Sequence, residues 1–206
     1  MASLSGDIID ACVTTIVGHT EELTALDQAI GDGDHGLNMK RGFEAVAAER
    51  DALAAMDAGA ALQKAGMTLV MKVGGASGPL YGSLFMAMGK AMPTAPQSVG
   101  DIAQALAAGI EAVKARGRSD LGDKTMLDVL GPVCDALTRA GDAAEAMENV
   151  CKTADEALES TRDMQAKKGR ASFLAERSIG HLDPGARSSQ LLVHAVCQSL
   201  KGKTGE

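Results

Sequence analysis

The residues DQAIGDGDHGLNM, at positions 27–39, decide how the fold and the site of this chain are understood. They contain GDGDHG (31–36), which matches the G-x-G-x-x-G pattern of turns that bring a dinucleotide's pyrophosphate close to the backbone. Three carboxylates accompany the glycines: Asp27, Asp32 and Asp34. Since a carboxylate repels a phosphate, the stretch needs an explanation other than direct phosphate binding.

Three familiar nucleotide-binding or metal-binding loops do not fit the sequence. A dinucleotide fingerprint needs a buried strand before its first glycine, whereas EELTALDQAI (21–30) is helical in pattern and partly charged. A calcium-binding EF-hand loop that began at Asp32 would need an acid at its twelfth position, where Phe43 stands. GRSDLGDKT (117–125) misses the G-x4-G-K-[ST] phosphate loop by one inserted residue, Asp123, and it follows a helical segment rather than a strand.

A site for a hard metal ion explains the acidic stretch better. In an extended loop, Asp32 and Asp34 project to the same side, and Asp27 lies one turn back at the end of the preceding helix. The interspersed glycines permit the backbone bends that bring these carboxylates together. Oxygen ligands favour magnesium, manganese or calcium over zinc, and magnesium completes its shell with water and substrate phosphates. The sequence therefore predicts that the acids hold metal ions, which in turn hold phosphate; a solvated acidic turn with a helix cap at Asn38 is the alternative.

Length and charge limit the class of protein. A chain of 206 residues fits one domain, which we expect to cover residues 1–206. The net charge of −7 argues against nucleic acid or an anionic membrane as a partner. No apolar run approaches the ~20 residues that span a bilayer, and the start, MASLSGDIIDACV, lacks the features of a signal peptide. We therefore expect a cytoplasmic protein.

The four cysteines agree with a reducing compartment. They are Cys12, Cys134, Cys151 and Cys197. They are far apart in sequence, form no C-x-x-C pair and stand among apolar helical neighbours. This pattern is typical of buried, reduced thiols rather than of disulfides or a zinc site.

The composition predicts an all-α fold. Aromatic residues make up 2% of the chain, and alternating runs of β-branched residues are missing, whereas strong helix formers such as Ala and Leu dominate. The periodicity of apolar residues predicts about eight helices and a short additional piece. They are expected over residues 5–20, 21–29, 38–56, 58–73, 79–92, 98–115 with Ser98 as N-cap, 125–140, 142–165 and 186–200. The long loops at 30–37 and 166–185 need a functional explanation.

DQAIGDGDHGLNM strongly resembles the signature of the nucleotide-binding L subunits of bacterial dihydroxyacetone kinases. The same module forms the C-terminal domain of single-chain dihydroxyacetone kinases. The resemblance continues in register through GGASGPLYGSLF (74–85), GRSDLGDKTMLDVLGP (117–132) and GRASFLAERSIGHLDPGARSS (169–189). It implies an eight-helix antiparallel barrel that binds a nucleotide, ADP or ATP, at one rim.

The resemblance also implies the residues of the site. Two magnesium ions would be held by Asp27, Asp32 and Asp34. Positions that match the family's nucleotide site are His35, Gly36, Leu37, Asn38, Ala76, Ser77, Gly117, Met126, Arg170, Asp183, Pro184 and Gly185.

Physical chemistry alone also suggests a role for some of these positions. In GGASG (74–78), backbone N–H groups at a helix N-terminus would make an anion site, although a simple interhelical turn would look the same. Gly117 and Met126 match positions that border the base and ribose; Met126 could equally be a core residue. Arg170 matches a basic residue near the phosphates, where a positive group would offset developing charge, and its alternative is a solvated loop residue.

The family's chemistry needs partners. The resemblance implies that the triose is held by a separate K subunit, through a histidine of that subunit. In the phosphotransferase-system version, ADP stays bound and is rephosphorylated by an M subunit, with phosphoenolpyruvate as the ultimate donor. In the other version, ATP exchanges from solution. A homodimer is also expected.

Two other functions stay open at this point. One is a kinase subunit for a related ketose such as erythrulose, because the K partner sets the sugar. The other is a regulatory module whose ADP form docks on a transcription factor.

Overall fold

The computed structural model describes residues 4–94 and 96–201, and every regular element in these ranges is helical. The all-α prediction is therefore confirmed for the described chain. The elements are α1 (Leu4–Gly18), α2 (Thr20–Ile30), α3 (His35–Ala48), α4 (Arg50–Ala54), α5 (Ala58–Lys72), α6 (Ser77–Ala91), α7 (Val99–Gly117), α8 (Leu127–Arg139), α9 (Ala143–Ser160), η1 (Thr161–Asp163), η2 (Arg170–Ser178) and α10 (Pro184–Lys201). η1 and η2 are 3-10 helices.

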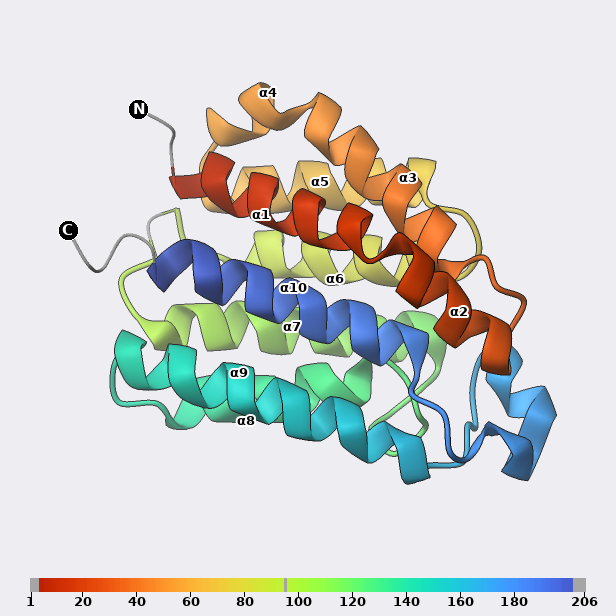
Figure 1. Cartoon of the computed structure of the whole chain (residues 1–206). Coiled ribbons are helices and arrows are strands. Elements are labelled where there is room, and N and C mark those ends of the chain that lie inside the picture. The colour runs from red at the N-terminus through yellow and green to blue at the C-terminus, as the bar shows by residue number, and fades with distance from the viewer. Residues whose placement is uncertain (1–3, 95, 202–206) are drawn as a thin grey trace.

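Among the described elements, eight long helices pack in a closed ring around one hydrophobic core. In order around the ring these are α1, α3, α5, α6, α7, α8, α9 and α10, and α10 packs back against α1. The connections join neighbouring helices end to end, so consecutive members run antiparallel (Figure 1). The eight-helix antiparallel arrangement implied by the resemblance agrees with this packing. α2 extends the chain beyond α1, and the short α4 joins α3 to α5.

The antiparallel ring brings four loops to the same end of the molecule. They are the connections at 31–34, 73–76, 118–126 and 161–183, which lie at the right-hand end in Figure 1. Each of the first three leads into a ring helix, and the last leads into α10. The four blocks of sequence that carry the resemblance therefore meet at one rim, although they are far apart along the chain.

Side-chain caps fix several helix starts where the sequence predicts them. Ser98 and Asp101 form a capping box: Ser98 Oγ accepts the N–H of Asp101, and Asp101 Oδ2 accepts the N–H of Ser98. Asp142 caps α9 by accepting the N–H of Glu145 at 2.9 Å. These bonds satisfy N–H groups that have no partner within the helix, which explains why the predicted starts of α7 and α9 are correct.

One predicted helix start is wrong in a way that matters for the site. The helix expected over 38–56 begins at His35 and is divided into α3 and α4. The earlier start follows from the carboxylate of Asp27, whose Oδ2 accepts the N–H groups of Asp34 and His35 at 2.8 and 3.1 Å. Asn38 consequently lies buried inside α3, and the alternative of a helix cap at Asn38 is excluded.

The predicted end of the seventh long helix is also wrong. The helix expected over 142–165 ends at Ser160 and continues as the 3-10 turn η1, in which the hydroxyl of Thr161 donates to the carbonyl oxygen of Leu158 at 2.7 Å. The same hydroxyl accepts the N–H of Asp183 at 3.2 Å, so the chain turns here toward the start of α10. The segment 166–185, expected as a loop, contains η2, which consists of two short 3-10 pieces joined at a kink at Ala175, where φ is +49°.

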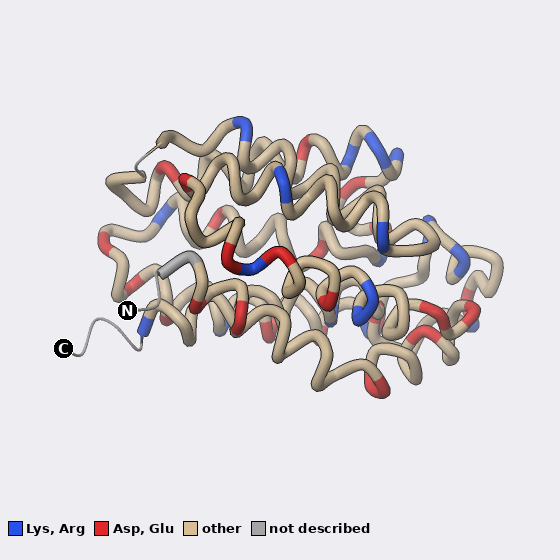
Figure 2. The backbone as a smooth tube through the Cα atoms, turned by 90° about the horizontal axis from the view of Figure 1, so that it is seen from above, with Lys and Arg blue, Asp and Glu red and all other residues tan. Residues whose placement is uncertain are grey.

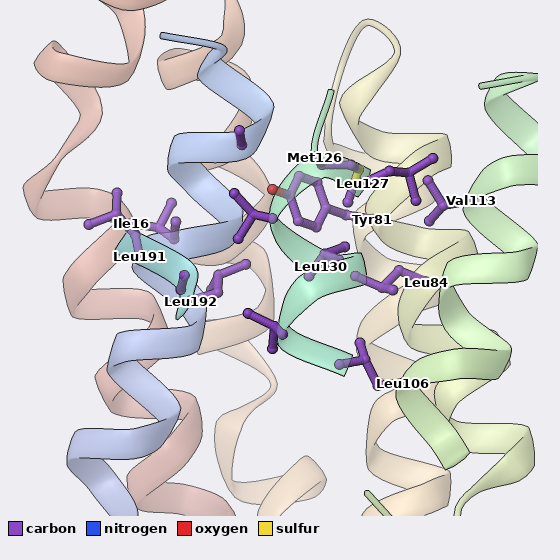
Figure 3. Packing of buried hydrophobic residues seen from close by; sticks show 14 of the residues in the cluster. Ile16, Tyr81, Leu84, Leu106, Val113, Met126, Leu127, Leu130, Leu191 and Leu192 are labelled. Carbon is purple, nitrogen blue, oxygen red and sulfur yellow. The ribbon is translucent and has the colours of Figure 1, made fainter. Parts of the chain in front are cut away.

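The core is mostly aliphatic, with one tyrosine near its rim end. Tyr81 of α6 is 1% exposed and lies beside Met126 and Leu127, with its hydroxyl oxygen pointing toward α10 (Figure 3). Leu191 and Leu192 of α10 belong to the same cluster. Burial of this apolar surface, at roughly 25 cal/mol per Å², is the main stabilising contribution to the fold.

Most charged residues of the described chain are not buried; the buried Asp, Glu, Lys and Arg residues are Asp27, Lys124, Asp128 and Asp183. In the view of Figure 2, acidic and basic positions intermingle along the helices, and neither sign covers the whole side that is seen. Within the ranges that the structure describes, no helix combines the length and the apolar character needed to cross a bilayer.

Glycines allow α5 and α6 to approach each other closely. A Cβ atom added at Gly66 would lie 2.8 Å from the carbonyl oxygen of Gly82 and 2.9 Å from the backbone nitrogen of Met86. A Cβ atom added at Gly89 would lie 2.4 Å from the carbonyl oxygen of Gly59. These three obstacles are backbone atoms, which cannot rotate away, so the spacing of the two helices depends on the absence of side chains at Gly66 and Gly89.

Gly66→Ala should therefore destabilise the fold by about 1–3 kcal/mol, the usual cost of overpacking a tight contact. Gly100→Ala is the matched control, because Gly100 is an exposed helical glycine whose added Cβ would meet only Ser98 Oγ, at 3.4 Å. It should be neutral or stabilising by up to about 1 kcal/mol through helix propensity. Urea unfolding of both variants measures the difference. Equal effects would mean that the glycine contact does not set the helix spacing.

Candidate functional site

Three carboxylates converge at the rim, where α2 leads into α3. Asp27, Asp32 and Asp34 each offer an oxygen, and these oxygens lie within 4.8 Å of one another. Asp27 is buried at the end of α2, whereas Asp32 and Asp34 are exposed. A cluster of three carboxylates is electrostatically costly by itself, and a small divalent cation is the ligand that best offsets it. The structure thus brings together the acids that the sequence singled out.

The glycines between these acids serve the geometry of the loop. A Cβ atom at Gly31 would lie 2.1 Å from Asp27 Oδ1, and one at Gly36 would lie 2.1 Å from the carbonyl oxygen of Thr20. Gly33 has φ of +77°, a left-handed conformation that favours glycine. The G-x-G-x-x-G pattern is therefore explained by a close carboxylate, a tight turn and the packing of α3 on α2.

Arg170 reaches this cluster from the distant segment 161–183. Its Nε lies 2.7 Å from Asp32 Oδ2, and its side chain is 70% exposed. An ion pair this exposed contributes at most about 1 kcal/mol, so Arg170 can exchange Asp32 for another anionic partner at little cost. The structure thus places Arg170 beside the acids rather than in free solvent.

A small second hydrophobic cluster holds the Arg170 segment against the acidic loop. Ile30, the last residue of α2, is 1% exposed and packs with Ala166 and Ala171, which are also buried. Leu174 lies partly buried against the same cluster. Because Ile30 precedes Asp32 by two residues and Ala171 follows Arg170, this contact brings the two charged groups together.

His35 connects three elements of the rim. Its Nδ1 lies 2.9 Å from Ser77 Oγ at the start of α6, and its Nε2 lies 2.9 Å from Ser188 Oγ on α10. Burial lowers the pKa of His35 to about 4, although the neighbouring Asp27 opposes the shift. The imidazole is therefore neutral at pH 7 and acts through its hydrogen bonds rather than through a charge.

The network continues to residues that the sequence did not single out. Tyr81 OH lies 2.7 Å from Ser188 Oγ and 2.9 Å from Ser189 Oγ, and it donates to the carbonyl oxygen of Gly185 at 3.2 Å. Tyr81, Ser188 and Ser189 all stand inside the blocks that carry the resemblance, which was the available signal. Their spacing along the chain gives no indication that they meet in space.

The glycine-rich loop GGASG lies beside the acidic loop. A Cβ atom at Gly74 would lie 2.7 Å from Asn38 Oδ1, and one at Gly75 would lie 3.6 Å from Asp34 Oδ2. Gly75 has φ of +63°, and Ala76 then leads into α6, which starts at Ser77. The loop therefore places the first turn of α6 close to Asp34. An anion site at this loop needs that arrangement, because the N–H groups of the first turn would bind the anion.

Helix polarity gives this rim a positive backbone field. The N-termini of α3, α6, α8 and α10 all follow rim loops, so the positive ends of their helix dipoles gather at one end of the ring. The acidic side chains stand within this field. The rim can therefore accommodate anions and cations together, which a metal complex of a nucleotide requires.

The remaining predicted residues differ in exposure. Leu37 is 56% exposed, whereas Met126 is 3% exposed and lies in the core, so most of its surface is not available to a ligand. Gly117 ends α7, partly buried. Asp183 caps α10 by accepting the N–H of Ala186 at 2.7 Å, and Pro184 begins that helix.

Asp183 lies in an unusual electrostatic environment. Burial raises its pKa to about 7, and the neighbouring charge of Asp128 adds to this shift. The N–H groups at the start of α10 and the ammonium of Lys124 oppose it. Near pH 7 the carboxyl group is therefore poised between its two protonation states.

Comparison with known proteins identifies the family. The DAK2 domain matches residues 29–198. The ADP-binding subunit of PEP-dependent dihydroxyacetone kinase 1 from Listeria innocua is 47% identical over 86% of this chain and 86% of its own length. The ADP-binding subunit of PEP-dependent dihydroxyacetone kinase from Escherichia coli is 43% identical over 88% of this chain and 89% of its own length.

A solved structure shares the fold. The crystal structure of the dihydroxyacetone kinase of C. freundii superimposes with a TM-score of 0.76 at 25% identity, over 95% of this chain and 34% of that longer chain. The resemblance seen in the four sequence blocks is confirmed by these matches. Fold, sequence and the order of the blocks lead to one conclusion: the chain belongs to the DAK2 domain family.

Proposed function

We propose that this chain is the nucleotide-carrying subunit of a dihydroxyacetone kinase and transfers a phosphoryl group from a bound nucleotide to a triose held by another subunit. The observation that carries the proposal is the convergence of Asp27, Asp32 and Asp34 with Arg170 at a rim where four helices begin. The names of the most similar relatives, ADP-binding subunits of dihydroxyacetone kinases, support it.

The acidic cluster fits magnesium. It offers only oxygen ligands, within 4.8 Å of one another, and it leaves Asp32 and Asp34 open to solvent. We propose two magnesium ions at these carboxylates, as in the family that the sequence resembles. When bound, magnesium neutralises charge on the phosphate oxygens during transfer. Asp27 has a second task, because its Oδ2 accepts two backbone N–H groups and fixes the loop.

The other residues of the rim would hold the nucleotide. The first turn of α6, at Ala76 and Ser77, offers N–H groups to phosphate oxygens. His35 fixes the orientation of the Ser77 hydroxyl through their 2.9 Å contact. Arg170 would move from Asp32 to the phosphates and balance charge as it develops, so most of the catalysis is positioning and electrostatics.

The partner that holds the sugar should dock over this rim. Four of the exposed large apolar residues in the described chain stand in or next to the site segments: Leu37, Leu121, Phe173 and Ile179. Phe173 is 86% exposed and lies one turn of η2 beyond Arg170. We propose a K subunit as the partner, and a phosphotransferase-system M subunit, with phosphoenolpyruvate as the donor, for recharging the bound ADP in the cytoplasm.

Magnesium and ADP together should stabilise the protein, because they bind the folded acidic cluster and not the unfolded chain. At free ligand about 100 times the dissociation constant, the gain is about 2.7 kcal/mol, and EDTA should abolish it. Thermal unfolding with magnesium alone, ADP alone, both, and both plus EDTA measures this. A melting temperature that ignores magnesium and ADP in combination would refute the proposed nucleotide site.

Asp32→Asn and Asp34→Asn should each abolish most of that stabilisation and most of the transfer to dihydroxyacetone. Both residues are exposed, and both changes conserve volume, so the fold without ligands should keep its stability. Asp135→Asn is the matched control, since Asp135 is an exposed acid far along α8 from the rim. Calorimetry with magnesium and ADP, and a transfer assay with a K subunit, give the readouts. Turnover near the wild-type value in either site variant would disprove the metal assignment.

Arg170→Ala should keep magnesium and ADP bound but lower turnover by roughly a hundredfold, the scale for loss of one preorganised charge donor. Arg170→Lys should recover only part, because an ammonium lacks the planar two-pronged contact of a guanidinium. Arg177→Ala is the control and should be neutral, since Arg177 is an exposed arginine of the same segment, beyond the kink of η2 at Ala175. Equal losses of affinity and turnover in Arg170→Ala would show that Arg170 only anchors the nucleotide.

A further inference from the structure

Lys124 is a lysine in a fully buried position. Its side chain belongs to the fully buried group, with 1% of the residue exposed, and its backbone is left-handed, with φ of +61°. Burial lowers the pKa of its ammonium, while the charges of Asp183 and Asp163 favour the charged form. A buried cation of this kind is costly unless hydrogen bonds satisfy it, so its partners indicate what it is for.

The ammonium of Lys124 joins the two ends of the segment that carries Arg170. Its Nζ donates to the carbonyl oxygen of Met164 at 3.0 Å and to that of Ser178 at 2.5 Å. These carbonyls are 14 residues apart along the chain, and η2 lies between them. One side chain from the loop before α8 thus joins the two ends of this segment. We call the place where residues 162–167 and 178–180 meet the neck of the segment.

Further bonds cross the same neck. Ser178 Oγ accepts the N–H of Ala166 at 2.9 Å, and the N–H of Gly180 donates to the carbonyl oxygen of Arg162 at 2.8 Å. The N–H of Lys167 donates to the carbonyl oxygen of Asp123, the residue before Lys124, at 3.1 Å. These hydrogen bonds fix the two ends of the segment relative to each other. The residues between the ends carry Arg170, whose guanidinium contacts Asp32.

We propose that Lys124 is a positioning residue. Because its ammonium binds the carbonyl oxygens of both Met164 and Ser178, it holds the segment between them in the position from which the guanidinium of Arg170 reaches the acidic cluster. The inference rests on the proposed role of Arg170 in transfer. The hydrogen bonds of the Lys124 ammonium go to the backbone of the segment, at Met164 and Ser178, and not to the acidic cluster or Arg170, so Lys124 acts through that backbone. Two anchors then define the segment, the ammonium at its neck and the packing of Ala166 and Ala171 on Ile30 at its outer side.

The test compares Lys124→Met, which removes both donors and nearly keeps the length of the side chain, with Lys152→Met. Lys152 is an exposed lysine of α9, so its replacement controls for loss of charge. Hydrogen exchange should become faster at amides of residues 165–179 in Lys124→Met, and it should stay unchanged in α5 and α6. Ser178→Ala loosens the same neck with a smaller change, and it should act in the same direction if Lys124→Met does not fold.

The activity readout is a double-mutant cycle with Arg170→Ala. Lys124→Met should lower turnover by about tenfold or more while affinity for magnesium and ADP changes by less than about threefold, since a displaced guanidinium affects mainly the transition state. In the Arg170→Ala background, Lys124→Met should cause no further loss of turnover. Lys124→Arg, which is too large for the buried neck, should not rescue.

The outcomes separate this inference from the proposed function. Unchanged exchange at 165–179 in Lys124→Met, or a loss of turnover that adds in full to that of Arg170→Ala, would overturn the positioning role and leave that of Arg170 intact. Normal turnover in Arg170→Ala itself would overturn both. Faster exchange together with a non-additive cycle is the result that the structure leads us to expect.

Discussion

The carboxylate of Asp27 is the interaction on which the site depends. One of its oxygens accepts two backbone N–H groups and thereby sets where α3 begins. Its other oxygen lies so close to Gly31 that no side chain would fit there. A buried acid thus shapes the loop that carries Asp32 and Asp34. The same carboxylate contributes negative charge to the site and determines where α3 begins. A neutral apolar residue at this position would remove both.

The closed ring of helices explains how distant segments share one site. With an even number of antiparallel members, every second helix begins at the same end, so four N-termini meet at the rim. His35 then connects α3 to α6 and α10 through Ser77 and Ser188. Buried hydrogen bonds thus join three of the rim helices without using the exposed charged groups, which suits a site whose charged groups must change partners.

Much of this could be predicted from the sequence, for identifiable reasons. Helix propensity and caps at Ser98 and Asp142 are local, so the all-α class and several helix starts are correct. The start of α3 at His35 depends on a carboxylate eight residues upstream, and periodicity alone predicts that start three residues too late. The grouping of Asp27, Asp32 and Asp34 was predicted because short spacing forces it. The roles of Tyr81 and Lys124 could not be predicted, because contacts between residues that are distant in sequence do not alter the local pattern of residues.

The burial of Tyr81 has a spectroscopic consequence. The chain contains one tyrosine and no tryptophan, so its ultraviolet emission comes essentially from a single ring. That ring is 1% exposed, and its hydroxyl is separated from His35 by one intervening serine. Since phenol emission is sensitive to hydrogen bonding at the hydroxyl, the protein carries its own optical reporter beside the rim. A change at the acidic loop that reaches the hydrogen bonds from His35 through Ser188 to Tyr81 should therefore alter this emission without any label.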